Sequence, residues 1–142
     1  MIRPARDLDA GALGAILSEF VKGTDWMPRL HSRAEDISFA AQLIAGHSVF
    51  VWDADRPLGF IALHQNSIDA LYIRNDQHGQ GYGSTLIQYA QSMRDELELR
   101  TFQQNTPARR FYAKHGFSVV KFTDGSGNDE GLPDVCLTWR AH

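Results

Sequence analysis

Apolar residues follow a helical period in the first third of the chain. Four of them recur three or four positions apart, the spacing of a helix that buries one face: Leu13, Ile16, Leu17 and Phe20. Asp7 or Asp9 is available to cap the start of this helix. Ser32 and Glu35 have the spacing of a capping box, in which each side chain satisfies a free backbone N–H group. The pattern therefore predicts a second helix after Ser32, and Gly46 is suited to a left-handed stop at its end.

After the second predicted helix, the pattern changes to short runs that are rich in β-forming residues. The runs cover residues 48–52, 58–63 and 67–73, and turn-forming residues separate them. Only a short polar turn lies between the last two runs, which predicts an antiparallel hairpin. Residues 1–4 are interpreted as one more short strand.

The second half of the chain mixes helical and strand signals. A glycine-rich turn at residues 78–83 is followed by helical spacing over residues 82–97. The dipeptide 106–107, a capping Thr followed by Pro, marks the start of a further helix, and Gly116 ends it. Strands are expected over three further segments: residues 99–102, 117–123 and 135–139.

These elements follow the order β-α-α-β-β-β-α-β-α-β-β. That order predicts an α/β fold, an α+β domain whose mixed sheet has about seven strands with four helices. No repeat, low-complexity segment or linker divides the chain, so residues 1–142 are expected to form a single domain.

Composition and charge narrow the classes of function. A formal net charge of −3 argues against general nucleic-acid binding, because neutralising phosphates requires a basic surface. The single Cys excludes an internal disulfide and suggests a reducing compartment. Neither a signal-peptide pattern nor a membrane-length apolar run is visible, and the histidines lack metal-ligand spacing. We therefore expect a cytoplasmic protein without a metal, a membrane or a nucleic-acid partner.

The most specific feature is the run His-Gly-Gln-Gly-Tyr-Gly-Ser at residues 78–84, between a predicted strand and a predicted helix. The first backbone N–H groups of a helix lack intrahelical partners and point out of its positive end. Glycines allow a pyrophosphate to approach that backbone closely. One glycine would indicate only a turn with positive φ, whereas three alternating glycines favour phosphate binding. The run is neither a P-loop nor a Rossmann fingerprint, because it lacks G-K-S/T and follows a hairpin.

Two blocks of the chain form motifs. His78, Gly81 and Gly83 match the pattern Q/R-x-x-G-x-G/A except at its first position. Residues 105–117 match the pattern N-x-x-A-x-x-F/L-Y-x-K/R-x-G-F. Both blocks, at this separation, resemble the GNAT superfamily of acyl-CoA-dependent N-acetyltransferases, and the order of elements extends the resemblance over nearly the whole chain. It implies a GNAT-like fold with a cofactor cleft where two central strands splay apart.

The resemblance implies acetyl-CoA as the co-substrate. Backbone groups of Leu71, Tyr72 and Ile73 would pair with the pantetheine arm, and one N–H group would polarise the thioester carbonyl. The pyrophosphate would lie on the turn residues His78, Gly79, Gln80, Gly81, Tyr82, Gly83 and Ser84. Asn105 would contact the pantetheine, and Arg109 would lie near the phosphates. Capping of a helix by Asn105 and a solvated position for Arg109 are the alternatives.

Acetyl transfer requires a neutral amine, so a base or a water path must take a proton from the ammonium group. By resemblance, Tyr112 protonates the leaving thiolate, and a Tyr hydroxyl is protonated at neutral pH. By the strand period of two, Asp69 shares a face with Ser67 and Leu71. Ser67 aligns with a catalytic Glu of some family members, so we expect Asp69 to be the base, directly or through water. Pairing of Asp69 with a neighbour, and His64 as the base, are the alternatives.

The acceptor pocket of this family is usually built from the first two helices and the last hairpin. In this chain those helices bring Trp26, Met27 and His31 as candidate substrate residues. The last hairpin has a loop at residues 124–134 with four acidic residues, including Asp134, and no basic one. An acidic mouth and an aromatic wall suit a cationic amine. Core packing of the aromatic residue and a solvated loop are the alternatives.

These features predict an enzyme that transfers acetyl from acetyl-CoA to a primary amine of a small molecule, by direct attack in a ternary complex. Acetylation of a protein N-terminus or lysine is a variant. An acyl-CoA-binding sensor without turnover is an alternative from another class of function. An unrelated module that binds a phosphate ligand is the third hypothesis. The exposed-strand pattern near the C-terminus permits a homodimer.

Overall fold

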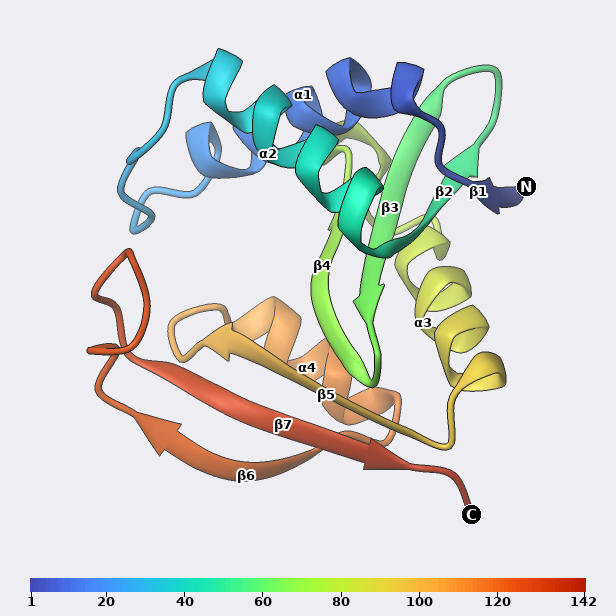
Figure 1. The fold of residues 1–142 in the computed structure, drawn as a ribbon. Helices are drawn as coiled ribbons and strands as arrows, with labels where there is room; N and C mark the ends of the chain where they lie inside the picture. The colour runs from blue at the N-terminus through green and yellow to red at the C-terminus, as the bar shows by residue number, and fades with distance from the viewer.

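The computed structural model describes residues 1–142 as one seven-stranded sheet with helices on both faces (Figure 1). Across the sheet the strands follow the order β1-β2-β3-β4-β5-β7-β6. The strands are β1 (Ile2–Pro4), β2 (Ser48–Asp53), β3 (Pro57–His64), β4 (Ser67–Ile73), β5 (Glu96–Phe102), β6 (Ser118–Thr123) and β7 (Asp134–Arg140). The helices are α1 (Ala10–Lys22), α2 (Arg33–Gly46), α3 (Tyr82–Met93) and α4 (Thr106–Lys114), with short 3-10 helices at Asp7–Asp9 and Asn75–Gln77. The predicted order of elements and the mixed sheet are confirmed.

Each face of the sheet has its own hydrophobic core. Helices α1 and α2 pack on one face through a buried cluster that includes Leu13. Helices α3 and α4 pack on the other face through a cluster that includes Leu86 and Tyr112. The central strand β3 contributes to both cores, since the neighbouring residues Phe60 and Ile61 are each 0% exposed. No helix on either face has both the length and the apolar character that crossing a membrane requires.

Strands β4 and β5 are the only parallel neighbours in the sheet, and they separate soon after they begin. Ser67 and Glu98 form their single registered pair, and the Glu98 N–H donates to the Asn66 carbonyl at 2.9 Å. Beyond this pair, β4 continues toward α1 whereas β5 runs toward the loop between β6 and β7 (Figure 1). The predicted splay of two central strands is therefore present.

A β-bulge at Asp69 changes which side chains of β4 face each core. Ala62 pairs with Ala70 and Leu63 pairs with Ile68, so Asp69 has no partner on β3. Ile68 consequently belongs to the core under α3 and α4, whereas Ala70 belongs to the core under α1 and α2. Two residues that are two positions apart thus face opposite sides of the sheet.

The prediction that Ser67, Asp69 and Leu71 share one face is therefore wrong. The period of two holds only along a regular strand, and the bulge inserts one residue between the two halves of β4. Leu71 and Ile73 pack against the α3–α4 core, and so does Ile68. Ser67, which directly precedes Ile68, accordingly points to the opposite face.

The first two helices begin in different ways. Helix α2 has the predicted capping box: the Ser32 N–H donates to Glu35 Oε1 at 2.9 Å, and the Glu35 N–H donates to Ser32 Oγ at 3.1 Å. Asp9 precedes α1 but does not cap it. Its carboxylate instead accepts hydrogen bonds from Arg3 Nη1 at 2.8 Å and from the Arg6 N–H at 2.7 Å. Asp9 therefore joins the N-terminal strand to the start of the 3-10 helix. It occupies the N-cap position of α1, but its side chain makes no hydrogen bond to that helix, so the predicted side-chain cap of α1 is not formed.

Two predicted helix ends also differ from the structure. Gly46 is the last residue of α2 and is not left-handed; His47 leaves the helix in an extended conformation with φ of −130°. Helix α3 ends at Met93, because Arg94 is extended and the following segment joins the sheet as β5. Leu97 matches the helical spacing only by coincidence, since it is buried in the α3–α4 core from a strand.

Gly14 and Gly11 lie in the same helix and should respond oppositely to substitution by alanine. A Cβ at Gly14 would lie 2.6 Å from Ile37 Cα in α2, whereas a Cβ at Gly11 meets nothing within 4 Å. We expect Gly14→Ala to lower the free energy of unfolding by about 1–3 kcal/mol, because α1 and α2 must move apart. We expect Gly11→Ala to raise it by roughly 0.5–1 kcal/mol, because alanine is the better helix former. Urea denaturation measures both, and equal effects would contradict the close packing of α1 on α2.

Candidate functional site

The turn before α3 presents unpaired backbone N–H groups. Gly79 and Gly81 have φ values of +80° and +85°, a conformation that glycine adopts without strain. Gly81 is the N-cap of α3, and no side chain caps this helix. The N–H groups of residues 81–84 have no acceptor within the chain, and a Cβ at Gly79 or Gly81 would meet nothing within 4 Å. Unpaired donors, open space and the positive end of a helix together form an anion site.

Side chains at both ends of the turn contact neighbouring elements through polar atoms. His78 Nε2 lies 3.0 Å from the carbonyl oxygen of Ile73 at the end of β4. Ser84 Oγ lies 3.0 Å from His115 Nε2, at the end of α4. His78, the position that departs from the family motif, thus contacts β4, and the N–H groups between the two ends stay free.

The remaining residues of the turn have different surroundings. Gln80 is exposed. Tyr82 packs edge-on against Trp52 of β2, with ring centroids 4.8 Å apart. A Cβ at Gly83 would lie 3.4 Å from the ring of Phe111 in α4. Gly83 therefore allows α4 to pack closely on α3, whereas Gly79 and Gly81 allow the positive φ values of the turn.

The second half of β4 has a free edge. Leu71, Tyr72 and Ile73 pair with β3 on one side. On the other side β5 has already diverged, because Ser67 with Glu98 is the only pair between the two strands. Backbone groups that point toward β5 therefore lack a strand partner, and this edge leads directly to the glycine turn. An extended ligand can pair with such an edge as an added strand does.

Tyr112 brings a protonated hydroxyl to this region from α4. Its ring packs edge-on against Phe111 and Phe117, with centroid distances of 5.2 and 5.4 Å. Burial, and secondarily the Tyr72 hydroxyl, raises the pKa of Tyr112 well above the ordinary tyrosine range. Burial also raises the pKa of Tyr72, and the Glu130 carboxylate adds to that shift. At neutral pH the Tyr112 hydroxyl therefore keeps its proton and can donate it.

Asp69 is paired with two neighbours. Its Oδ2 lies 2.8 Å from His47 Nε2, and its Oδ1 accepts a hydrogen bond from Ser67 Oγ at 2.6 Å. The His47 ring also lies beside the ring of His64, with centroids 5.4 Å apart. This arrangement corresponds to the pairing alternative rather than to a free base. No group of three or more His, Cys, Asp or Glu side chains is placed to hold a metal ion.

Asn105 and Arg109 are engaged within the chain. Asn105 Oδ1 accepts a hydrogen bond from the Ala108 N–H at 3.2 Å and so caps α4. Arg109 Nη1 donates to the Gln103 carbonyl at 3.2 Å, and its guanidinium carbon lies 5.6 Å from the centroid of the Phe122 ring in β6. The structure does not bring Arg109 to the glycine turn, because Arg109 points to the face of α4 that meets β6.

Trp26 joins the loop between α1 and α2 to the end of β5. Its ring packs edge-on against Phe102, with centroids 5.7 Å apart. The loop between α1 and α2 and the end of β5 both lie on the side where β4 and β5 diverge (Figure 1). Met27 is half-buried. His31 is exposed, with Nδ1 3.9 Å from Glu35 Oε2. Of these three candidate substrate residues, Trp26 packs on the end of β5, and His31 interacts with the start of α2.

Asp134 lies inside the base of the loop between β6 and β7 rather than in an acidic mouth. It is only 3% exposed. Its carboxylate accepts hydrogen bonds from Thr123 Oγ1 and, at 3.2 Å, from Asn128 Nδ2. Asp134 therefore braces the loop, which corrects its expected contact with a substrate.

Glu130 is a candidate that the sequence pattern did not single out. Its Oε2 atom is buried without a hydrogen-bond partner, although the loop around it is largely exposed. No periodicity marks this position, because local turns and Asn128 set the conformation of the loop. The one available signal was the absence of a basic residue from the segment 124–134.

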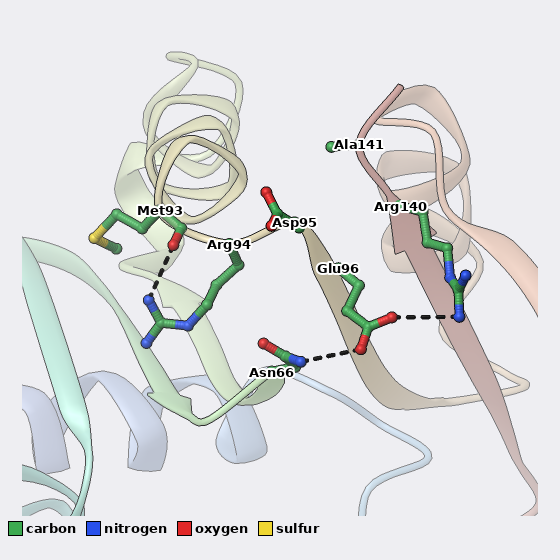
Figure 2. A pocket seen from close by; sticks show the side chains of 7 residues that line it. All are labelled: Asn66, Met93, Arg94, Asp95, Glu96, Arg140 and Ala141. Carbon is green, nitrogen blue, oxygen red and sulfur yellow. Dashed lines mark hydrogen bonds and ion pairs between the residues drawn. The ribbon is translucent and has the colours of Figure 1, made fainter.

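Two cavities lie away from the glycine turn. The larger, about 500 Å³, is at the start of β5, where Asn66 Nδ2 donates to Glu96 Oε1 at 3.1 Å and Arg140 lies 3.4 Å from Glu96 (Figure 2). The smaller, about 290 Å³, lies between α4 and the β6–β7 hairpin and is lined in part by Arg109. Apart from Arg109, no predicted cofactor residue lines either cavity. Most of the predicted cofactor residues lie instead on the open glycine turn and on the free edge of β4.

Comparison with protein families identifies one match. The family model described as an acetyltransferase (GNAT) domain matches residues 45–119. This segment extends from the end of α2 to the start of β6. It therefore includes the splayed strands, the glycine turn and Tyr112.

Two relatives share parts of the sequence. Peptidyl-lysine N-acetyltransferase YjaB from Escherichia coli is 42% identical over 72 residues, which are 51% of this chain and 49% of YjaB. The match thus spans about half the length of that relative. Peptidyl-lysine N-acetyltransferase YiaC from Escherichia coli is 31% identical over 99 residues, 68% of this chain and 66% of YiaC.

Solved structures extend the likeness to nearly the whole chain. The apo-form solution structure of YjaB from Escherichia coli has a TM-score of 0.81 at 29% identity and covers 98% of this chain and 96% of that one. YncA from Salmonella typhimurium, solved with its cofactor acetyl-CoA, has a TM-score of 0.75 at 19% identity and covers 100% and 95%. The likeness to YncA concerns the fold, and both structures confirm the predicted architecture.

The buried Tyr112 hydroxyl predicts a spectroscopic result. Because the pKa of Tyr112 is raised well above that of a free tyrosine, this hydroxyl should still be protonated at about pH 10.5. Folded wild-type protein and Tyr112→Phe should then have equal ultraviolet phenolate absorbance at that pH. After denaturation the wild type should gain about three-quarters of a phenolate more than the variant, because a free tyrosine is about three-quarters ionised at that pH. A difference of this size between the folded proteins would contradict the burial of this group.

Proposed function

Because the chain belongs to the GNAT acetyltransferase family, we propose that it transfers the acetyl group of acetyl-CoA to a primary amine. The observation that carries this proposal is the uncapped start of α3 at the end of the splayed strand β4. There, free N–H groups of a helix follow a free strand edge. Acetyl-CoA is complementary to both features, because it combines a diphosphate with an extended, amide-containing arm.

The two parts of acetyl-CoA would bind to consecutive segments of the chain. The pyrophosphate would accept hydrogen bonds from the N–H groups of residues 81–84, which have no acceptor of their own. The pantetheine would extend along the free edge from Ile73 toward Leu71. There a β4 N–H group would stabilise the negative charge that develops on the thioester oxygen. The fold shared with YncA, which was solved with acetyl-CoA, supports this choice of ligand.

The chemistry needs no covalent intermediate on the protein. In a ternary complex, the amine nitrogen bonds to the acetyl carbon, the carbon–sulfur bond breaks, and the thiolate takes a proton. We assign the donor of that proton to Tyr112, because a tyrosine hydroxyl is protonated at neutral pH and Leu71 and Ile73 of β4 pack against the cluster that contains Tyr112.

The acceptor class that we propose is a lysine side chain of a protein. YjaB and YiaC are both named peptidyl-lysine N-acetyltransferases, which favours this variant over the small-molecule amine suggested first by the sequence. A small-molecule amine is the second candidate. The contact between Trp26 and Phe102 favours it, because an aromatic pair can hold the apolar body or the cation of a small amine.

The glycine turn can be tested with Gly81→Ala. A Cβ at this position enters the open space before the free N–H groups, and the left-handed conformation costs alanine roughly 1–2 kcal/mol. We expect the affinity for acetyl-CoA and for desulfo-CoA, measured by titration calorimetry, to fall about tenfold. Gly131→Ala is the matched control, because Gly131 also has positive φ and open space but lies in the β6–β7 loop. Equal losses in the two variants would contradict a phosphate site at Gly81.

Tyr112→Phe separates turnover from binding. We expect kcat for thiol release from acetyl-CoA, with a lysine-containing peptide as acceptor, to fall about 100-fold or more. The affinity for acetyl-CoA should stay within about twofold, because the phenyl ring preserves the packing of α4. Unchanged turnover would refute Tyr112 as the acid. A wild-type protein that binds acetyl-CoA but never releases thiol would instead favour the alternative function of an acyl-CoA-binding sensor.

A further inference from the structure

The loop between β6 and β7, residues 124–133, is braced by its own hydrogen bonds. Asn128 Nδ2 donates to the Leu132 carbonyl at 2.8 Å and to Asp134 Oδ2 at 3.2 Å. The Leu132 N–H donates to Asn128 Oδ1 at 3.3 Å. Glu130 lies between the two bonded residues, so its backbone is held on both sides. The backbone of Glu130 is therefore held in a defined position, in a loop that lies near the end of β5 and the connection between α1 and α2 (Figure 1).

Glu130 turns one carboxylate oxygen away from solvent. Its Oε2 is buried and receives no hydrogen bond, whereas the neighbouring Asp129 is exposed. A buried carboxylate oxygen without a donor is unfavourable in a folded chain, so such a group calls for an explanation. A ligand that brings its own N–H donors would complete the hydrogen bonding of this oxygen.

The surroundings of Glu130 suit a cationic donor. Burial raises the pKa of Tyr72 of β4, and the Glu130 carboxylate adds to that shift. Burial likewise raises the pKa of Tyr112 of α4, and the Tyr72 hydroxyl adds to it. The Tyr72 ring is fixed between Phe20 and Phe60, at centroid distances of 5.1 and 6.0 Å. No Lys, Arg or His pairs with Glu130 Oε2. Glu130 Oε2 is thus a buried acceptor that no cationic side chain of this chain occupies.

Asp69, the base expected from the sequence, is less suited to take a proton. Both of its oxygens already have partners, His47 at 2.8 Å and Ser67 at 2.6 Å. An acceptor amine would have to displace one of these partners to reach Asp69. Glu130 Oε2 has no such partner.

We propose that Glu130 receives the ammonium group of the acceptor and takes its proton; this inference rests on the proposed acetyl transfer. Glu130 Oε2 accepts one proton from R–NH₃⁺, and the lone pair of the neutral amine then forms the bond to the acetyl carbon. The carbon–sulfur bond breaks. A second amine proton reaches the thiolate through Tyr112, and the third stays on the amide nitrogen. The proton on Glu130 passes to solvent, so the products are the amide, the CoA thiol and one proton.

The test compares Glu130→Gln with Asp129→Asn, because each removes one negative charge from the same loop. The acceptor is a synthetic peptide with one lysine and a blocked N-terminus, and thiol release from acetyl-CoA is followed from about pH 7 to 9.5. We expect kcat/KM near pH 7 to fall about 100-fold or more in Glu130→Gln and less than about twofold in Asp129→Asn. The affinity for acetyl-CoA should be equal in all three proteins.

The pH profile distinguishes a base from a structural residue. A lysine amine has a pKa of about 10.4, so raising the pH supplies neutral amine without the help of a base. The deficit of Glu130→Gln should therefore shrink toward about pH 9.5. Its melting temperature should be no lower than that of the wild type, because glutamine keeps the shape of the side chain and the substitution replaces a carboxylate that has one buried oxygen without a donor.

Several outcomes would overturn the inference. Equal turnover of the wild type and Glu130→Gln would overturn it alone, as would a deficit that is constant with pH. Equal losses in Glu130→Gln and Asp129→Asn would mean that the loop acts only through its summed charge. A wild-type protein that binds acetyl-CoA but acetylates neither the peptide nor propylamine would overturn the proposed function together with the role of Glu130.

Discussion

The parallel pairing of β4 and β5 stops after one residue pair, and the rest of the site depends on this divergence. A strand inside a sheet normally satisfies its N–H and C=O groups on both sides, but the second half of β4 does so only toward β3. The bulge at Asp69 adds a local change of twist close to where the strands part. Because the uncapped start of α3 follows the same strand, two sets of free backbone groups are arranged one after the other along the chain.

Most of the fold could be predicted wherever local chemistry decides the structure. The capping box of Ser32 with Glu35 forms as expected, and Gly116 ends α4 with a φ of +89°. The end of α3 could not be predicted in the same way, because Leu97 fits both a helical and a strand pattern. A contact with a distant segment marks that boundary: Arg94 Nε donates to the Gln65 carbonyl at 2.9 Å.

Some features of the candidate site follow from the local sequence, whereas others arise only from contacts between distant segments of the chain. Gly79 and Gly81 could be predicted, because a positive φ and a free N–H are properties of the backbone that glycine spacing indicates. The surroundings of Asp69 could not, because its partner His47 lies 22 residues earlier and a bulge is not visible in the alternation of the strand. Glu130 escaped notice for a related reason: the burial of a single oxygen in a loop is a property of the folded chain alone.

The free edge of β4 has a consequence for the behaviour of the protein at high concentration. An unpaired strand edge is a template for any extended polypeptide, including a partly unfolded copy of the same chain. Here the exposed template lies in the middle of the sheet, between β4 and the departing β5, instead of at an outer strand. A small molecule that occupies this edge would act as a protective cover. If acetyl-CoA binds along this edge as proposed, the tendency of the protein to aggregate would fall as the concentration of acetyl-CoA rises.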